Sequence, residues 1–239
     1  ITNFVLKHND LIFVLSKEHQ EMLKKRGFES YYITNGVDIT FNFTKEQCRR
    51  ELNLGDGKHI VYVGRLDKTK GVIYAVKAVE GLNVTLHIIG EESGGRYGAT
   101  EEIREYITNH NMKNVIFHSV LERPSTFSYI KAADIFLHPL LEAWGMGNAV
   151  LEAMHLGTPV IGTNIGYFKE LIGNNERGIL IEKANHLALR DAINKLLIDK
   201  KLTSKLAENA YKYVKENHDW NKIAEEFEKT VNKNMKNQK

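Results

Sequence analysis

Cysteine is nearly absent from this sequence, since Cys48 is the only one among its 239 residues. A single cysteine excludes an intrachain disulfide and a cysteine-rich zinc site, and it fits a reducing compartment. The ten histidines show no HExxH pattern or other metal-ligand spacing. We therefore expect no metal site.

Long apolar runs and an excess of one charge are also missing. No run reaches the roughly 18 residues that a membrane-spanning helix needs, and no signal-peptide pattern is visible. The 33 lysines and arginines nearly balance the 30 acidic residues, which gives a net charge of +3. Nucleic-acid-binding proteins carry a basic patch or stripe, so we expect a cytoplasmic protein without a nucleic-acid partner.

The remaining sequence alternates between short apolar runs rich in β-formers and stretches with helical spacing. We expect strands at 11–16, 30–33, 59–64, 84–90, 114–119, 134–139, 159–163 and 178–182. Helical patterns lie between most of them, and helices alone follow at 184–199, 202–216 and 219–235. This alternation predicts an α/β fold, with a parallel sheet flanked by helices on both faces.

One boundary is visible near the N-terminus, where NGVD at 35–38 is a turn signal. A polar stretch follows it before the next helical pattern at 45–52, so we place a linker at 34–44. Upstream lies one β-α-β piece that is too small to fold alone, and downstream lies a complete α/β domain.

The first candidate site is GRLDKTKG at 64–71, which follows a strand and opens a helix. Turns of this kind at the carboxyl end of a parallel sheet bind ligands. Gly64 lets a ligand approach the backbone, and Arg65 and Lys70 add two cations near a helix N-terminus, which itself favours anions. We interpret the segment as a clamp for a diphosphate. A solvated basic loop is the alternative.

The second candidate site is EAWGMGNAVLEAMHLGTP at 142–159. Gly145 and Gly147 precede a helical pattern, where backbone N–H groups can face a phosphate. Glu152 lies one turn into that helix, where its carboxylate can accept two hydrogen bonds from a ribose diol. The alternatives are ordinary loop flexibility and a surface glutamate, but neither explains why Glu152 lies among small and apolar residues.

Three motifs in order carry a family resemblance: NGVD at 35–38, VGRLDKTKGV at 63–72 and HPLLEAWGMGNAVLEAMHLGTPVIGT at 138–163. This order is similar to that of the retaining glycosyltransferases of family 4, the group 1 glycosyltransferases, which have the GT-B fold. The resemblance covers essentially the whole chain and implies the C-terminal half of that fold. It implies three parts: a residual last β-α-β segment of the N-terminal domain at 1–34, a Rossmann-like donor-binding domain at 35–217, and a closing helix and tail at 218–239.

The resemblance also implies roles for single residues. Arg65 and Lys70 match the basic pair that binds the donor diphosphate and stabilises the departing nucleotide. Glu152 matches the second of the family's paired glutamates, which holds the ribose, and Val120 matches a segment that flanks the base. The loop and helix start that contact the donor correspond to Gly145, Met146, Gly147 and Asn148, and Gly64 belongs to the same donor site.

The paired glutamates depart from the family's pattern. The family separates them by seven residues, whereas nine lie between Glu142 and Glu152. Counting back by the usual spacing reaches Trp144, which cannot accept a hydrogen bond from a sugar hydroxyl. Either the loop carries two extra residues and Glu142 keeps the catalytic and sugar-binding role, or the first glutamate is lost. We expect the former, because an aromatic residue and a glycine closely follow Glu142.

By resemblance, the reaction transfers a glycosyl group from a nucleoside diphosphate sugar with retention, without a metal or other cofactor. The acceptor binds mostly to the N-terminal domain, which this chain almost wholly lacks, so we expect weak nucleotide-sugar binding and little activity alone. The expected partner is that missing domain, in the same chain or as a partner subunit. The start at Ile1 inside a helical pattern favours an excised piece. A location at the membrane surface is expected if the full enzyme's acceptor lies there.

Two other classes of protein compete with this hypothesis. A non-catalytic nucleotide-sugar-binding or regulatory module is supported by the altered glutamate spacing. Another GT-B enzyme, such as an epimerase or a phosphorylase, is disfavoured by the basic pair and the helix around Glu152. Among the other polar residues, we interpret His118 and His138 as core or strand-end histidines and Asp67 as an ion-pair partner of Arg65. GGRYG at 94–98 is a weak signal for the border of the donor pocket.

Overall fold

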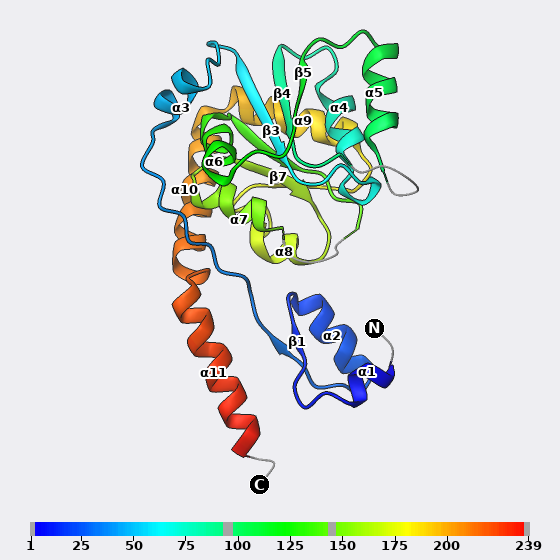
Figure 1. Ribbon diagram of the computed structural model, residues 1–239, viewed down its shortest axis with the longest axis vertical. Helices are drawn as coiled ribbons and strands as arrows, with labels where there is room; N and C mark the ends of the chain where they lie inside the picture. The colour runs from blue at the N-terminus through cyan, green and yellow to red at the C-terminus, as the bar shows by residue number, and fades with distance from the viewer. Residues whose placement is uncertain (1–2, 93–97, 143–146, 237–239) are drawn as a thin grey trace.

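A computed structural model describes residues 3–92, 98–142 and 147–236 (Figure 1). Its centre is a parallel six-stranded sheet with the strand order β5-β4-β3-β6-β7-β8. The strands are β3 (Lys58–Val63), β4 (Val84–Ile89), β5 (Val115–His118), β6 (Ile135–His138), β7 (Val160–Thr163) and β8 (Ile179–Ile181). The expected α/β fold with a parallel sheet is confirmed.

The strand order reverses beside β3, which pairs with β4 on one side and with β6 on the other. Ile60 of β3 is opposite Leu86 of β4 and also opposite Ile135 of β6. Because all six strands are parallel, their carboxyl ends meet at one edge of the sheet. In open α/β sheets, ligands bind outside the carboxyl ends at such a reversal point.

Helices cover both faces of the sheet, so the strands are nearly continuous apolar runs. The buried apolar side chains form two core clusters, one on each face of the sheet. On β3, Ile60 and Tyr62 belong to the first cluster, and Val61, on the opposite face, belongs to the second. The first cluster is covered by α4 (Val72–Val79), α5 (Thr100–Asn109) and α9 (His186–Ile198). The second is covered by α6 (Arg123–Ala132), α7 (Asn148–His155) and α8 (Tyr167–Ile172), with α3 (Lys45–Glu51) packed on α6. Helix α10 (Lys200–Asn217) contacts both α7 and α9.

The short helix α8 was not predicted from the sequence. It has only six residues, and it is bounded by Gly166 and Gly173, both with positive φ. Glycines at both ends of so short a segment are typical of a loop. Its helical state follows from tertiary burial of its apolar side chains, such as Phe168 and Leu171, against the second core cluster.

A small N-terminal unit packs on the last helix, away from the sheet (Figure 1). It comprises α1 (Asn3–Lys7), β1 (Phe13–Val14), α2 (Lys17–Lys25) and β2 (Tyr31–Tyr32), and the last helix is α11 (Trp220–Lys236). The ring centroids of Phe13 and Phe227 are 4.8 Å apart. The Tyr31 hydroxyl donates to Oδ1 of Asn234 over 2.9 Å. The two ends of the chain therefore form one packed unit.

The segment that connects the N-terminal unit to the sheet domain is held at the junction of α10 and α11. The imidazole Nδ1 of His218 lies 2.8 Å from the carbonyl oxygen of Asn35 and 3.0 Å from the hydroxyl of Thr34. A Cβ at Gly36 would lie 2.4 Å from the ring of Trp220. Only glycine therefore allows this close packing against the indole.

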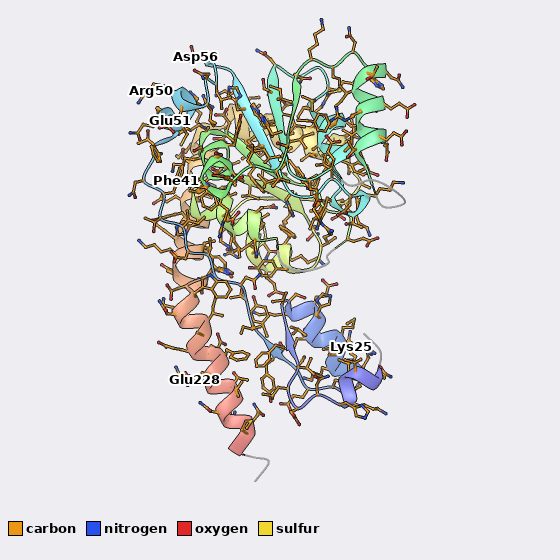
Figure 2. The ribbon with its side chains drawn as sticks, in the orientation of Figure 1. Lys25, Phe41, Arg50, Glu51, Asp56 and Glu228 are labelled. Carbon is orange, nitrogen blue, oxygen red and sulfur yellow. The ribbon has the colours of Figure 1, made fainter. Side chains whose placement is uncertain are left out.

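Charged side chains of both signs lie on the surface of the described residues. Figure 2 shows Lys25, Arg50, Glu51, Asp56 and Glu228 at the periphery of the molecule, and all five side chains are exposed. Within the described residues, every helix is too short or too polar to span a bilayer.

A chain of three hydrogen-bonded histidines crosses the sheet beneath α6. Nδ1 of His59 lies 3.1 Å from Nε2 of His87, whose Nδ1 lies 3.0 Å from Nε2 of His118. Nε2 of His59 lies 3.1 Å from the carbonyl oxygen of Gly55. Because this carbonyl can only accept, His59 donates to it through Nε2. In the uncharged form of the chain, Nδ1 of His59 then accepts from Nε2 of His87, and Nδ1 of His87 accepts from Nε2 of His118, so each ring donates in the same direction.

The three hydrogen-bonded histidines predict that the folded protein loses stability in acid. Burial, together with the charges of His118 and His59, lowers the pKa of His87 from 6.5 to about 4. Between these values the unfolded chain binds the proton and the folded chain does not, so stability is lost as the pH falls from 6.5 towards 4. The contribution of His87 should be at most about 1.4 kcal/mol per pH unit. Urea unfolding of the wild type and of His87→Gln at pH 7, 6 and 5 measures it.

Glutamine can donate and accept hydrogen bonds but does not titrate in this range. The His87→Gln variant should therefore show a shallower loss of unfolding free energy with falling pH. An identical slope in both proteins would contradict a neutral His87 in the folded chain.

Candidate functional site

The loop from β3 to α4 carries the first set of predicted site residues, Gly64, Arg65 and Lys70. The buried carboxylate of Asp67 orders this loop, because it accepts from the backbone N–H of Thr69 over 3.0 Å and from the Thr69 hydroxyl. These bonds start the 3-10 turn η1 (Lys68–Lys70). An aspartate two residues before a backbone N–H is a usual device for such turns.

Arg65 is tied to this loop but remains accessible. Its guanidinium lies 3.3 Å from the carboxylate of Asp67, as the sequence suggested, and its side chain is 66% exposed. The backbone carbonyl of Arg65 accepts from the hydroxyl of the buried Tyr62 over 2.9 Å. The backbone at Arg65 is thus fixed, and the charged end of the side chain faces solvent.

Lys70 is a half-buried cation close to an uncharged histidine. Burial first, and then the positive charge of Lys70, lowers the pKa of His138 from 6.5 to about 3. His138 therefore stays neutral, buried at the end of β6 as expected. The backbone N–H of Lys70 donates to the carbonyl of Asp67 over 3.0 Å, but within the described ranges its ammonium group has neither a hydrogen bond nor an acidic partner, so its charge is available to an anion.

The β6–α7 loop, which follows His138, is joined directly to the first loop. The backbone N–H of Leu141 donates to the carbonyl of Thr69 over 2.8 Å. Gly71 has φ +64, and a Cβ there would lie 2.0 Å from the carbonyl oxygen of Pro139. The two loops therefore touch backbone to backbone, which brings Lys70 and the exposed Glu142 to the same edge.

Part of the second loop lies outside the described residues. Trp144 and the predicted donor-binding residues Gly145 and Met146 fall in residues 143–146, and most of GGRYG falls in residues 93–97. The description resumes at Gly147, directly before α7.

Among the described residues, no side chain caps the N-terminus of α7. The backbone N–H of Val150 donates to the carbonyl of Gly147 over 2.9 Å, which leaves the N–H groups of Asn148 and Ala149 to face a ligand anion. The side chain of Asn148, the first residue of the helix, accepts from Nδ2 of Asn35 over 2.8 Å. Gly147 packs closely, because a Cβ there would lie 3.0 Å from Phe168 and 3.2 Å from His138.

Glu152, one turn into α7, is a mostly buried carboxylate. Its side chain is 16% exposed, and its Oε1 accepts from Nη2 of Arg123 over 2.9 Å. Burial raises the pKa of this carboxyl, and the charge of Arg123 and the hydrogen bond from it act in the opposite direction. Val120, beyond the end of β5, is 66% exposed. The contact between Arg123 and Glu152 was not predicted from the sequence. A usable signal was the position of Arg123 just before Pro124, at the start of a helix beside the same edge of the sheet.

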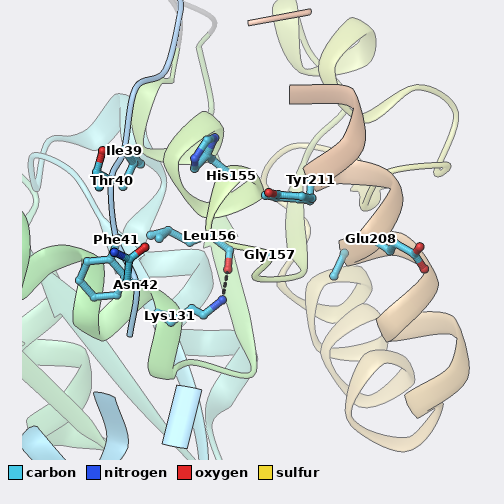
Figure 3. A pocket seen from close by; sticks show the side chains of 11 residues that line it. Ile39, Thr40, Phe41, Asn42, Lys131, His155, Leu156, Gly157, Glu208 and Tyr211 are labelled. Carbon is cyan, nitrogen blue, oxygen red and sulfur yellow. Dashed lines mark hydrogen bonds between the residues drawn. The ribbon is translucent and has the colours of Figure 1, made fainter. Parts of the chain in front are cut away.

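A surface pocket of about 620 Å³ lies at the opposite end of α7 (Figure 3). It lies between the 39–42 segment, the end of α7 and α10, where Nζ of Lys131 donates to the carbonyl of Leu156 over 2.8 Å. None of the predicted site residues lines it. Within the described part of the chain, no group of three or more His, Cys, Asp or Glu side chains could hold a metal ion.

Comparisons with known proteins point to one family. The family model described as glycosyl transferases group 1 matches residues 44–213. The capsular polysaccharide biosynthesis glycosyltransferase CapM of Staphylococcus aureus is 30% identical over 97% of this chain and 60% of its own length. The chain thus spans about three-fifths of such a relative.

Solved structures show the same fold. Sucrose-phosphate synthase of Thermosynechococcus elongatus superposes with a TM-score of 0.87 and 25% identity, over 96% of this chain and 59% of the other. HepE of Anabaena, solved with UDP and glucose, also has a TM-score of 0.87, with 22% identity over 96% of this chain and 65% of its own. These neighbours are GT-B glycosyltransferases, so the sheet domain has the fold of the C-terminal GT-B half.

The contact between the two loops predicts the effect of adding one methyl group. Gly71→Ala should lower the free energy of unfolding by about 2 to 4 kcal/mol, because the methyl group meets the carbonyl oxygen of Pro139 and φ is positive. Gly81→Ala is the matched control, since Gly81 has φ +71 but nothing lies within 4 Å of its Cβ position. That control should lose only about 1 kcal/mol. Equal losses in urea unfolding would contradict the described loop contact.

Proposed function

Because the chain belongs to the group 1 glycosyl transferases, we propose that it binds a nucleoside diphosphate sugar as the donor half of a retaining glycosyltransferase of family 4. The contact between the β3–α4 and β6–α7 loops carries this proposal. The hydrogen bond from Leu141 to Thr69 holds two cations and a glutamate at one edge of the sheet. The UDP in the HepE structure supports a nucleoside diphosphate as the ligand class.

In this proposal, Arg65 and Lys70 bind the diphosphate. Arg65 is exposed and held beside Asp67, and Lys70 has no acidic partner among the described side chains. When the bond between the sugar and the diphosphate breaks, negative charge develops on the leaving nucleotide. Fixed cations and the open N-terminus of α7 stabilise that charge. We therefore propose that the reaction proceeds without a metal ion.

Glu152 and Glu142 take the two remaining roles. The Glu152 carboxylate accepts hydrogen bonds from the ribose hydroxyls, with Val120 beside the base. Glu142, which follows Leu141 in the loop contact, binds the donor sugar in this proposal, and the sequence from Gly145 to Asn148 completes the donor-binding loop. The extra length of the glutamate motif then lies between Glu142 and Gly147.

A binding experiment tests the nucleotide site. Calorimetric titration with UDP, GDP and ADP should show binding of at least one of them. Arg65→Ala and Lys70→Ala should each weaken it about tenfold or more, since hydrogen bonds to charged groups are the strong ones.

The matched control is Lys68→Ala, in the same 3-10 turn as Lys70 and exposed. It should bind nearly as the wild type does. An equal loss in this control would show a general charge effect, and no binding of any nucleotide would overturn the proposed site.

If this chain binds the donor and other sequence binds the acceptor, the chain alone should be inactive as a transferase. By family resemblance, the acceptor is bound by sequence that the longer relatives have and this chain does not cover. The chain alone should therefore bind nucleotide but transfer no sugar to an added acceptor. Chromatographic detection of a glycosylated product above the no-protein background would contradict this prediction.

A further inference from the structure

Arg123 is held in place from two sides. Its guanidinium lies 5.3 Å from the ring centroid of Phe127, one turn further along α6. The same group donates to Oε1 of Glu152 on α7 over 2.9 Å. Phe127 itself is buried, with an edge-on contact to Phe41. The arginine therefore bridges the N-terminal parts of α6 and α7 beside the edge where the two site loops meet.

The ion pair leaves the carboxylate only partly used. A carboxylate has two oxygens and about four acceptor positions. Arg123 uses one oxygen, and among the described residues no other hydrogen bond to this carboxylate occurs. The second oxygen can therefore accept from a ligand without displacing the arginine.

Ionisation of Glu152 decides whether it can bind a diol. An ionised carboxylate only accepts hydrogen bonds, as two donating hydroxyls require, whereas a protonated one is itself a donor. Burial favours the protonated form of this side chain, and Arg123 favours the ionised form. The arginine thus opposes the effect of burial on its neighbour.

The other groups around α7 do not replace this charge. Helix α10 presents Tyr211 and Lys215 to the histidine that ends α7. Strand β6 ends in His138, which is neutral, and β7 has the sequence VIGT without a titratable side chain. Arg123, from α6, is the charged group that acts on Glu152 among the described residues.

We propose that Arg123 is a positioning residue of the donor site, which keeps the Glu152 carboxylate ionised and oriented with one oxygen directed to the ribose diol. This inference rests on the proposed function. The guanidinium acts through Glu152 and does not bind the diphosphate. It therefore matters for nucleosides and not for a phosphate ligand that lacks ribose.

The test is the pH dependence of binding. Calorimetry with the nucleoside diphosphate that the wild type binds, and with inorganic pyrophosphate, is run from pH 8 to pH 5 on the wild type and on Arg123→Gln. At pH 8 the variant should bind the nucleotide within about twofold of the wild type. Near pH 5.5 it should bind about two- to fivefold more weakly, the range that exposed ion pairs contribute. The loss of nucleotide affinity at acid pH, the acid limb of the profile, should therefore begin at a higher pH in the variant than in the wild type. The affinity for pyrophosphate should be the same in both proteins.

Two further variants keep the result interpretable. Arg123→Lys retains the charge and should restore the wild-type profile. Arg104→Gln is the matched control, because Arg104 is also an exposed helix arginine, paired with Glu92 over 2.6 Å and stacked 4.6 Å from the ring of Phe117. It lies on α5, on the other face of the sheet, and should leave the profile unchanged.

Several outcomes would overturn the inference. Tighter nucleotide binding by Arg123→Gln would mean that the arginine obstructs the ribose. An equal loss of pyrophosphate affinity would mean that it binds phosphate, and an unshifted acid limb would mean that it does not act through Glu152. Absence of nucleotide binding by the wild type would instead reject the proposed function, and this inference with it.

Discussion

The close approach of the β3–α4 and β6–α7 loops is the constraint on which the candidate site depends. These loops leave neighbouring strands at the point where the strand order reverses, and their backbones touch between Gly71 and Pro139. No side chain fits between them, so the position of one loop sets the position of the other. The basic residues of the first loop and the acidic residues of the second and its helix therefore lie along one edge of the sheet.

Much of the fold could be predicted because its signals are local. Each expected strand was found, since an apolar run bounded by turn residues carries its own pattern. The helix α8 was missed because its state depends on burial of Phe168 and Leu171 against distant residues, not on its own sequence.

The candidate site was only partly predictable for the same reason. Arg65, Lys70 and Glu152 stand in motifs, so their positions could be read directly. Arg123 reaches Glu152 from 29 residues away, and no motif connects the two. Whether residues named from motifs hold a nucleotide sugar depends on binding chemistry that neither periodicity nor burial determines.

The bond between Asn35 and Asn148 joins the connecting segment to the helix that begins at the site. On its other side, the same segment contacts His218 and Trp220 at the junction of α10 and α11. The N-terminal unit, the last helix and the start of α7 thus share one small group of contacts. A movement of the N-terminal unit about this junction would therefore displace or strain the first turn of α7 through the bond between Asn35 and Asn148.

The three histidines that form the hydrogen-bonded chain across the sheet differ in which replacements they tolerate. The middle ring both donates and accepts, so its replacement must do both, as glutamine or asparagine can. His118 at the open end needs only a donor towards its neighbour, whereas His59 is fixed on both sides by a carbonyl and by another ring. Among homologous chains that keep this network, the residue at the position of His118 should vary most. The residues at the positions of His59 and His87 should change together.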